Sequence, residues 1–367
     1  MGLNFIAKLA TLALAAVGAA AFEAADADTP YYNEHGILQV GTLEAANVTV
    51  AAGARHDEVV SFAGASYIAV QFAGFDLEAG DLVVVRSPDA SASYIYSEKG
   101  RDNRGDFIAT FIPGDTAVVQ YFPASTATTT NSAFSISGFF RGFPAKSDES
   151  LCGSDNTRPA KCYASGNTLY SSLPNAYTNA GHLITNQHCI TSASDAAALD
   201  VEFNAESSAC SVECKTQLGC AGTTVATTTT LITNDEDLDY ALVKLPSSAS
   251  ISSYGYLQLR ASGPKLGEQI YIPQHPVGYA KRIASVVDGG SVATILSTGA
   301  THSCGTNQVG YNADTQGGSS GSPVIAASDN AVVALHHCGG CQNVAVDVRD
   351  IISDLKTKGI SVANLSV

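Results

Sequence analysis

The sequence predicts an all-β protein in two parts, and three observations support this. Its 367 residues suffice for two ordinary domains. Only 14% of the residues are charged and 45% are hydrophobic, a balance that permits a sizeable core and excludes a disordered chain. All nine cysteines lie between Cys152 and Cys341, so a cysteine-free first part precedes a cysteine-bearing second part.

The first part, residues 30–143, is expected to be a β-sandwich. Ile68, Val70 and Phe72 alternate with other residues, and the runs 82–85, 107–111 and 117–121 continue the pattern between short turn signals. The texture resembles CUB-like or bacterial prepeptidase-type sandwiches. No motif here carries chemistry, so we expect a pro-region or an accessory binding module. A polar linker at residues 144–150 follows it.

The N-terminus predicts export. Residues 1–8 carry one positive charge, and an apolar, Ala-rich run from Leu9 to Ala21 is followed by small residues. This pattern is typical of a secretory signal peptide, which we place at residues 1–24. The run is shorter than the ~20 residues of a membrane span. We therefore expect a secreted, extracellular protein.

The charge argues against two kinds of partner. With 19 basic and 34 acidic residues, the formal net charge is −15. Nucleic acids and anionic membranes repel such a chain, so we expect neither as a partner.

Three segments of the second part, residues 146–367, carry residues suited to catalysis. His188 follows an apolar strand, Asp239 opens another, and Ser320 lies in a glycine-rich turn before a third. A serine hydroxyl needs a base to act as a nucleophile, a histidine can supply it, and a buried aspartate orients the imidazole. The amides of Gly318 and Ser320 are expected to face a developing oxyanion.

The order His188, Asp239, Ser320, with Gly-Ser-Ser-Gly-Ser-Pro at residues 318–323, resembles the trypsin/chymotrypsin-like serine proteases. The likeness is closest to the secreted microbial branch of glutamyl and lysyl endopeptidases, and it extends over about residues 152–355. It implies a double antiparallel β-barrel with the site between the barrels. It also implies peptide hydrolysis through an acyl-enzyme, protein or peptide substrates, a monomer, no metal and no cofactor.

Two departures from that family change the expectations. Ser319 stands where trypsin-type zymogens have the Asp that receives a new N-terminal ammonium, so we do not expect that activation. The stretch between Cys162 and His188 lacks the apolar strands that should open the first barrel, so we expect an incomplete barrel. The alternative function is therefore a catalytically impaired homologue that acts as a binding or inhibitor-like protein.

Substrate preference depends on three residues. Asp314 occupies the position at which trypsin reads Arg and Lys, whereas Thr315 and His336 match residues of the glutamyl branch. A neutral Thr with an imidazole can bind a carboxylate, while an exposed Asp314 carboxylate would bind an ammonium or guanidinium. We favour Glu or Asp slightly over Lys or Arg.

The cysteines are expected to form disulfides, as in other exported proteins. The resemblance implies the pairs Cys152–Cys341 and Cys162–Cys210. Elimination adds Cys214–Cys220 and Cys304–Cys338 and leaves Cys189 unpaired. The His336–Cys341 run could also be a zinc site or a redox pair, but disulfide and pocket roles are favoured. A lipase-type nucleophile elbow is disfavoured because Ser322 occupies its second glycine position.

Overall fold

The computed structural model describes residues 41–124, 132–143, 151, 153–163, 181–220, 222–302 and 304–367. The predicted signal peptide, the predicted linker and Cys152 lie outside these residues. The described chain consists of antiparallel strand pairs with two α-helices, α1 (Ala193–Ala197) and α2 (Val348–Thr357). The predicted all-β class is therefore confirmed. No helix in the described ranges has the length and apolar character needed to cross a membrane.

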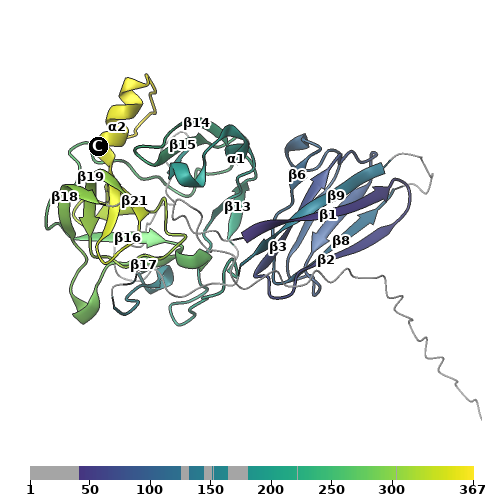
Figure 1. Ribbon diagram of the computed structural model, residues 1–367, viewed down its shortest axis with the longest axis horizontal. Coiled ribbons are helices and arrows are strands. Elements are labelled where there is room, and N and C mark those ends of the chain that lie inside the picture. The colour runs from purple at the N-terminus through teal and green to yellow at the C-terminus, as the bar shows by residue number, and fades with distance from the viewer. Residues whose placement is uncertain are drawn as a thin grey trace, which may run out of the picture.

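The N-terminal strands form two facing sheets, at the right of Figure 1. One sheet contains β1 (Gly41–Ala51), β9 (Ser132–Gly142), β3 (Tyr67–Ala73), β6 (Phe107–Ile108) and β7 (Ile112–Pro113). The other contains β2 (His56–Ser61), β8 (Thr116–Phe122), β4 (Leu82–Arg86) and β5 (Ser93–Tyr96). Alternate residues of both sheets point inward, as the period-two pattern predicts. The aromatic rings of Phe72, Phe75 and Phe134 pack together between them.

The C-terminal strands form one large sheet and two small ones. An eight-stranded sheet runs in the order β10 (Arg158–Pro159), β17 (Arg282–Ala284), β16 (Ile270–Gln274), β20 (Pro323–Ala326), β21 (Val332–Cys338), β22 (Asn343–Asp347), β19 (Gly305–Tyr311) and β18 (Ile295–His302). A three-stranded sheet contains β11 (His182–Thr185), β15 (Tyr240–Lys244) and β14 (Thr230–Asp235), and a two-stranded sheet contains β12 (Val201–Phe203) and β13 (Thr223–Ala226).

The C-terminal helix packs on the eight-stranded sheet. Ile351 and Leu355, one turn apart on α2, are buried in the apolar cluster of that sheet. Gly359 follows the helix with φ +68°, a conformation that glycine adopts without strain.

The sandwich contacts the small sheets through two arginines. Arg101, in the turn η1 (Arg101–Asn103), pairs with Asp200, and its Nε donates to the carbonyl of Thr227 at 2.9 Å. Arg104 Nη1 donates to the carbonyl of Ala197, the last residue of α1, at 3.0 Å. The small sheets therefore lie between the sandwich and the eight-stranded sheet (Figure 1).

Candidate active site

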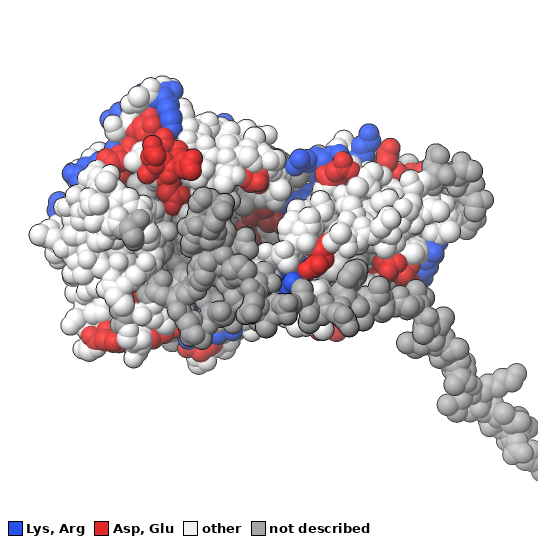
Figure 2. Space-filling view, viewed as in Figure 1, with Lys and Arg blue, Asp and Glu red and all other residues white. Residues whose placement is uncertain are grey.

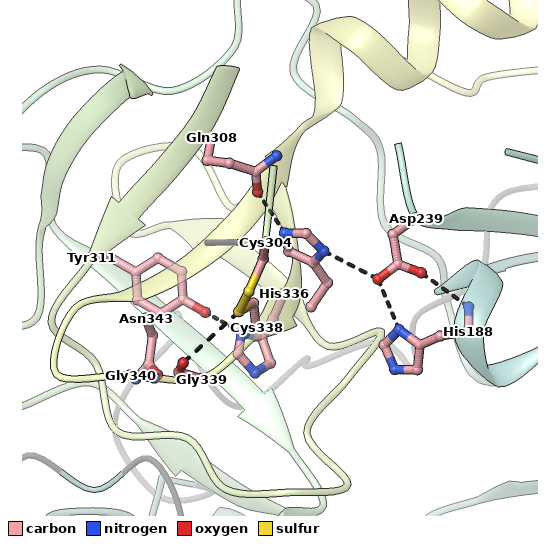
Figure 3. The surroundings of a disulfide bond; sticks show 11 residues. His188, Asp239, Cys304, Gln308, Tyr311, His336, Cys338, Gly339, Gly340 and Asn343 are labelled. Carbon is pink, nitrogen blue, oxygen red and sulfur yellow. Dashed lines mark hydrogen bonds and ion pairs between the residues drawn. A yellow bond between two sulfur atoms is a disulfide. The ribbon is translucent and has the colours of Figure 1, made fainter. Parts of the chain in front are cut away.

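Strand pairing brings His188 and Asp239 together. In the antiparallel pair β11–β15, Thr185 faces Ala241, so the chain leaving β11 and the chain entering β15 meet at one end. His188 lies in the turn η3 (Gln187–Cys189), and its Nδ1 is 2.8 Å from Asp239 Oδ2. The other carboxylate oxygen accepts from the backbone N–H of His188 at 3.0 Å (Figure 3). Two contacts thus orient the imidazole.

The backbone at Asp239 is also held. The Nδ2 of Asn186, a fully buried residue, donates to the Asp239 carbonyl at 2.9 Å. Asp239 has φ 47°, in the left-handed region that side chains rarely adopt. This backbone conformation is strained for a residue with a side chain. It persists only where the surrounding structure imposes it, and such residues are common at functional sites.

The pair is charged at neutral pH. Burial opposes the charge on His188, but the hydrogen bond that its ring donates to Asp239 and the neighbouring Cys189 raise the pKa of His188 to about 10. For Asp239 burial acts against ionisation, and the hydrogen bonds from His188 and His337 lower its pKa to about 2. An imidazolium therefore faces a carboxylate over a wide pH range.

The turn before β20 presents Ser320. Gly321, with φ +82°, lies against β11, since a Cβ there would be 2.4 Å from Thr185 Oγ1. Glycine thus lets the Ser320 turn approach the strand that leads to His188. The N–H groups of Gly318 and Ser320 donate to no described residue, and Ser320 Oγ has no hydrogen bond among them. The structure places Ser320 near the His188 end of β11 without joining the two side chains.

Ser319 holds the loop that precedes Ser320. Its side chain is fully buried, its N–H donates to the Gln316 carbonyl at 2.9 Å, and its Oγ accepts from the Gln316 N–H at 3.2 Å. The carbonyl of Gly317 accepts from the N–H of Val277 at 2.7 Å. These bonds fix the peptide plane that carries the Gly318 N–H.

The candidate specificity residues lie in different surroundings. The Asp314 carboxylate is 3% exposed and accepts from the backbone N–H of Asn156 at 2.9 Å. Burial, with the nearby charges of Asp155 and Asp288, raises its pKa. Asp314 is therefore turned away from solvent and engaged by the chain.

Thr315 and His336 are buried as well. Thr315 Oγ1 has no hydrogen-bond partner among the described residues. His336 Nδ1 lies 2.5 Å from the hydroxyl of Tyr311, and burial, with the charge of His337, lowers the pKa of His336 to about 3 (Figure 3). His336 is therefore neutral at physiological pH.

Three disulfides join the cysteines Cys162–Cys210, Cys214–Cys220 and Cys304–Cys338. These are three of the four pairs expected from the sequence. Cys189 and Cys341 are exposed, and neither forms a disulfide with a cysteine that the structure describes. The pair Cys152–Cys341 stays a prediction, since Cys152 lies outside the described residues.

Sequence reasoning missed one residue of the site, His337. Its Nδ1 is 3.1 Å from Asp239 Oδ2, and its Nε2 is 2.5 Å from Gln308 Oε1. The doublet His336-His337 was visible, and side chains of neighbouring strand residues face opposite ways. A role for His336 on one side therefore implied that His337 faced something else.

Helix α2 anchors the loop that carries Asp239. The hydroxyl of Tyr240, the next residue, donates to Asp354 Oδ2 at 2.5 Å, and Lys358 Nζ contacts Asp354 at 2.6 Å and Asp235 at 3.1 Å. Figure 2 shows acidic side chains gathered beside α2. Within the described ranges, no group of three or more His, Cys, Asp or Glu side chains is arranged to hold a metal ion.

Comparison with known proteins identifies the family. Residues 175–335 match the trypsin-like peptidase domain. The chain is 42% identical over 332 residues to Secreted RxLR effector protein 73 of Plasmopara viticola, covering 82% of this chain and 81% of that protein. Among solved structures, a serine endoprotease from Yersinia pestis matches with TM-score 0.35 and 14% identity, over 50% of this chain and 56% of that one. An HtrA-type protease with decapeptide matches with TM-score 0.36 and 15% identity, over 51% of each chain. The chain therefore belongs to the same family as Secreted RxLR effector protein 73 and carries a trypsin-like peptidase domain.

Proposed function

We propose that this protein is a secreted serine endopeptidase in which Ser320 is the nucleophile, His188 the base and Asp239 the residue that orients the base. The observation that carries the proposal is the two-point contact between Asp239 and His188, with Oδ2 on Nδ1 at 2.8 Å and Oδ1 on the backbone N–H at 3.0 Å. This contact fixes the ring so that Nε2 is left to face a substrate. The name of the relative supports secretion.

Peptide hydrolysis by this site needs water as its only co-reactant. Ser320 Oγ attacks the peptide carbonyl while its proton passes to His188 Nε2. The Gly318 and Ser320 N–H groups, which have no described partner, donate to the oxyanion. The intermediate collapses to an acyl-enzyme as His188 protonates the leaving amine. Water, deprotonated by His188, then releases the acid and restores Ser320.

The raised pKa of His188 sets a pH dependence. A base with a pKa of about 10 is protonated at neutral pH in the free protein. Only its neutral form accepts the Ser320 proton, so activity is expected to rise from neutral to alkaline pH.

The specificity proposal is cleavage after Glu or Asp. Thr315 Oγ1 is a buried hydroxyl without a described partner, and the neutral ring of His336 is buried in the same half of the molecule. Both can donate to a carboxylate. Asp314, by contrast, is engaged by Asn156 and poorly available to a cationic side chain. These contacts support the carboxylate choice over Lys or Arg.

A second candidate function is a binding protein with an impaired site. The observation that favours it is the Ser320 hydroxyl, which makes no hydrogen bond to His188 among the described residues, where the His188 ring contacts Asp239. Catalytic hydrogen bonds are often long before substrate binds, so this observation is compatible with an enzyme.

Labelling with a fluorophosphonate separates the two candidates. An endopeptidase should give one covalent adduct per chain, mapped to Ser320 and absent from Ser320→Ala. Ser322→Ala, a change of a neighbouring serine in the same turn, is the matched control and should keep the adduct. A folded wild-type protein that takes no label over a pH range up to 10 would support the binding protein instead.

A further inference from the structure

His337 links the two halves of the site. It lies on β21 of the eight-stranded sheet, yet its Nδ1 is 3.1 Å from Asp239 Oδ2, the same oxygen that contacts His188. Its Nε2 is 2.5 Å from Oε1 of Gln308, on β19. The His337 side chain is 4% exposed, so water does not replace these partners. Figure 3 labels both partners of His337, Gln308 and Asp239, and shows His188 beside Asp239.

The partners of Gln308 fix which end of its amide faces His337. Its Nε2 donates to the carbonyl of Thr306 at 3.0 Å, and a carbonyl can only accept. The amide oxygen is therefore the atom that faces His337 Nε2. The Asp239 carboxylate is likewise an acceptor. Both ring nitrogens of His337 thus face acceptors, and both must carry a hydrogen.

A neutral imidazole has one N–H, and only the imidazolium has two. We propose that His337 is a positioning residue, held as an imidazolium between Gln308 and Asp239, which aims the Asp239 carboxylate at His188. Its catalytic part rests on the proposed function, while its protonation state does not. Because His337 and His188 both contact Asp239 Oδ2, only one orientation of the Asp239 carboxylate satisfies both imidazole rings.

The charge of His337 has its own consequence. The ionisable groups that face it are Asp239 from the entry of β15, His188 from η3 and His336 from its own strand. Of these, Asp239 favours the proton on His188, whereas a second imidazolium opposes it. His337 therefore limits how tightly His188 holds its proton and makes the base available at lower pH.

Ring-nitrogen NMR tests the protonation state without relying on activity. The full chain is prepared as Ser320→Ala with 15N-histidine, and the His337 signals are assigned by their loss in His337→Asn. We expect both nitrogens to be protonated at pH 7, and one to lose its proton in Gln308→Met, which has no acceptor there. His56→Asn, a change in the sandwich, serves as the assignment control. A His337 ring with one bare nitrogen at pH 7, or a ring unaffected by Gln308→Met, overturns the proposal.

The kinetic arm separates positioning from general stability. His337→Asn keeps a donor for Asp239 but has no charge, so the plateau of kcat/KM should stay within about threefold while the acid limb moves up by about one pH unit. His337→Leu has no donor and should lower kcat by ~30-fold with KM little changed. An acid limb that stays in place in His337→Asn overturns the electrostatic role. An inactive wild type refutes the proposed function, and the NMR result still decides the state of His337.

Discussion

The two halves of the peptidase region hold their candidate residues in different ways. Ser320 leads into the eight-stranded sheet, which takes part in two large apolar clusters. One of these also contains Tyr240 and Leu242 of β15. His188 and Asp239 flank the three-stranded sheet. The two apolar clusters confined to the small sheets, α1 and adjoining residues have four buried members each: Val201, Phe203, Ala226 and Leu245 in one, and Ile190, Ala196, Ala241 and Val243 in the other. Since buried apolar area supplies most folding free energy, the Ser320 half should be the more stable.

Polar contacts from outside compensate the half that carries His188. The sandwich reaches it through Arg101, β21 through His337, and α2 through Asp354. Hydrogen bonds and ion pairs are directional, so they fix orientation even where they add little net stability. The geometry of the candidate site and the global stability therefore depend on different contacts in this molecule.

The largest expected effect is a loss of turnover, and it should be equally large for a substitution in either half. Ser320→Ala and His188→Ala should each lower kcat by about 10⁴-fold or more, and the double variant should lose little further, because the residues act as a unit. Turnover of a peptide substrate, measured with protein freed of wild-type traces, provides the test. Normal turnover of Ser320→Ala would show that the assignment is wrong.

The next largest effect is a loss of stability that should be confined to the half that carries His188. Arg101 is 7% exposed in its pair with Asp200, so Arg101→Ala leaves a carboxylate without its partner and should destabilise the contacting segment by about 3 kcal/mol. Hydrogen exchange should rise in α1, β12 and β13 while β16 and β20 stay protected. Arg86→Ala is the matched control, because Arg86 bonds Gln120 within the sandwich. Equal exchange changes in both halves would refute the comparison.

The sequence predicted the elements whose signal is local. Alternating residues located β4 and β8, and the strand contexts of His188, Asp239 and Ser320 located the site candidates. Each of these signals lies within about ten neighbouring residues.

The contacts between distant segments could not be predicted in this way. Arg101 and Asp200 are 99 residues apart and carry no motif, and Gln308 is one polar residue on an ordinary strand. Their roles arise only when the sheets pack. His337 could be predicted only in part, because the sequence shows it beside His336 but does not show that it contacts Asp239. The direction of Asp314 also depended on a distant residue, Asn156.

A smaller effect concerns specificity within the Ser320 half. If His336 donates to the substrate carboxylate, His336→Ala should lower kcat/KM for cleavage after Glu by ~30-fold, and leave cleavage of an ester without a charged side chain nearly unchanged. Digestion of a protein library by the wild type and by His336→Ala gives the test. Cuts found only after Lys or Arg would assign the pocket to Asp314.

The smallest expected effect concerns Cys189 and returns to the half with fewer apolar contacts. Cys189 is exposed, lies next to His188 and forms no disulfide with a described cysteine. Burial opposes the charge on His188, whereas the hydrogen bond to Asp239 and, after it, the neighbouring Cys189 raise the pKa of His188. Cys189→Ser should therefore lower that pKa and move the acid limb of kcat/KM to lower pH. The sign for stability follows from the same shift. With a folded pKa of about 10 against a model value of 6.5, the proton on His188 stabilises the fold below pH 6.5, and this contribution is lost as the pH rises through 10.

Thiol titration of the native protein checks the cysteine assignment behind this prediction. We expect one reactive thiol per chain, and none in Cys189→Ser, if Cys152 pairs with Cys341. Three thiols in the wild type would refute that pairing and leave Cys189 free, whereas no thiol in a monomer would contradict a free Cys189. An acid limb that does not move in Cys189→Ser would show that Asp239 alone keeps the proton on His188. The difference between the halves would then rest on fewer contacts than we infer.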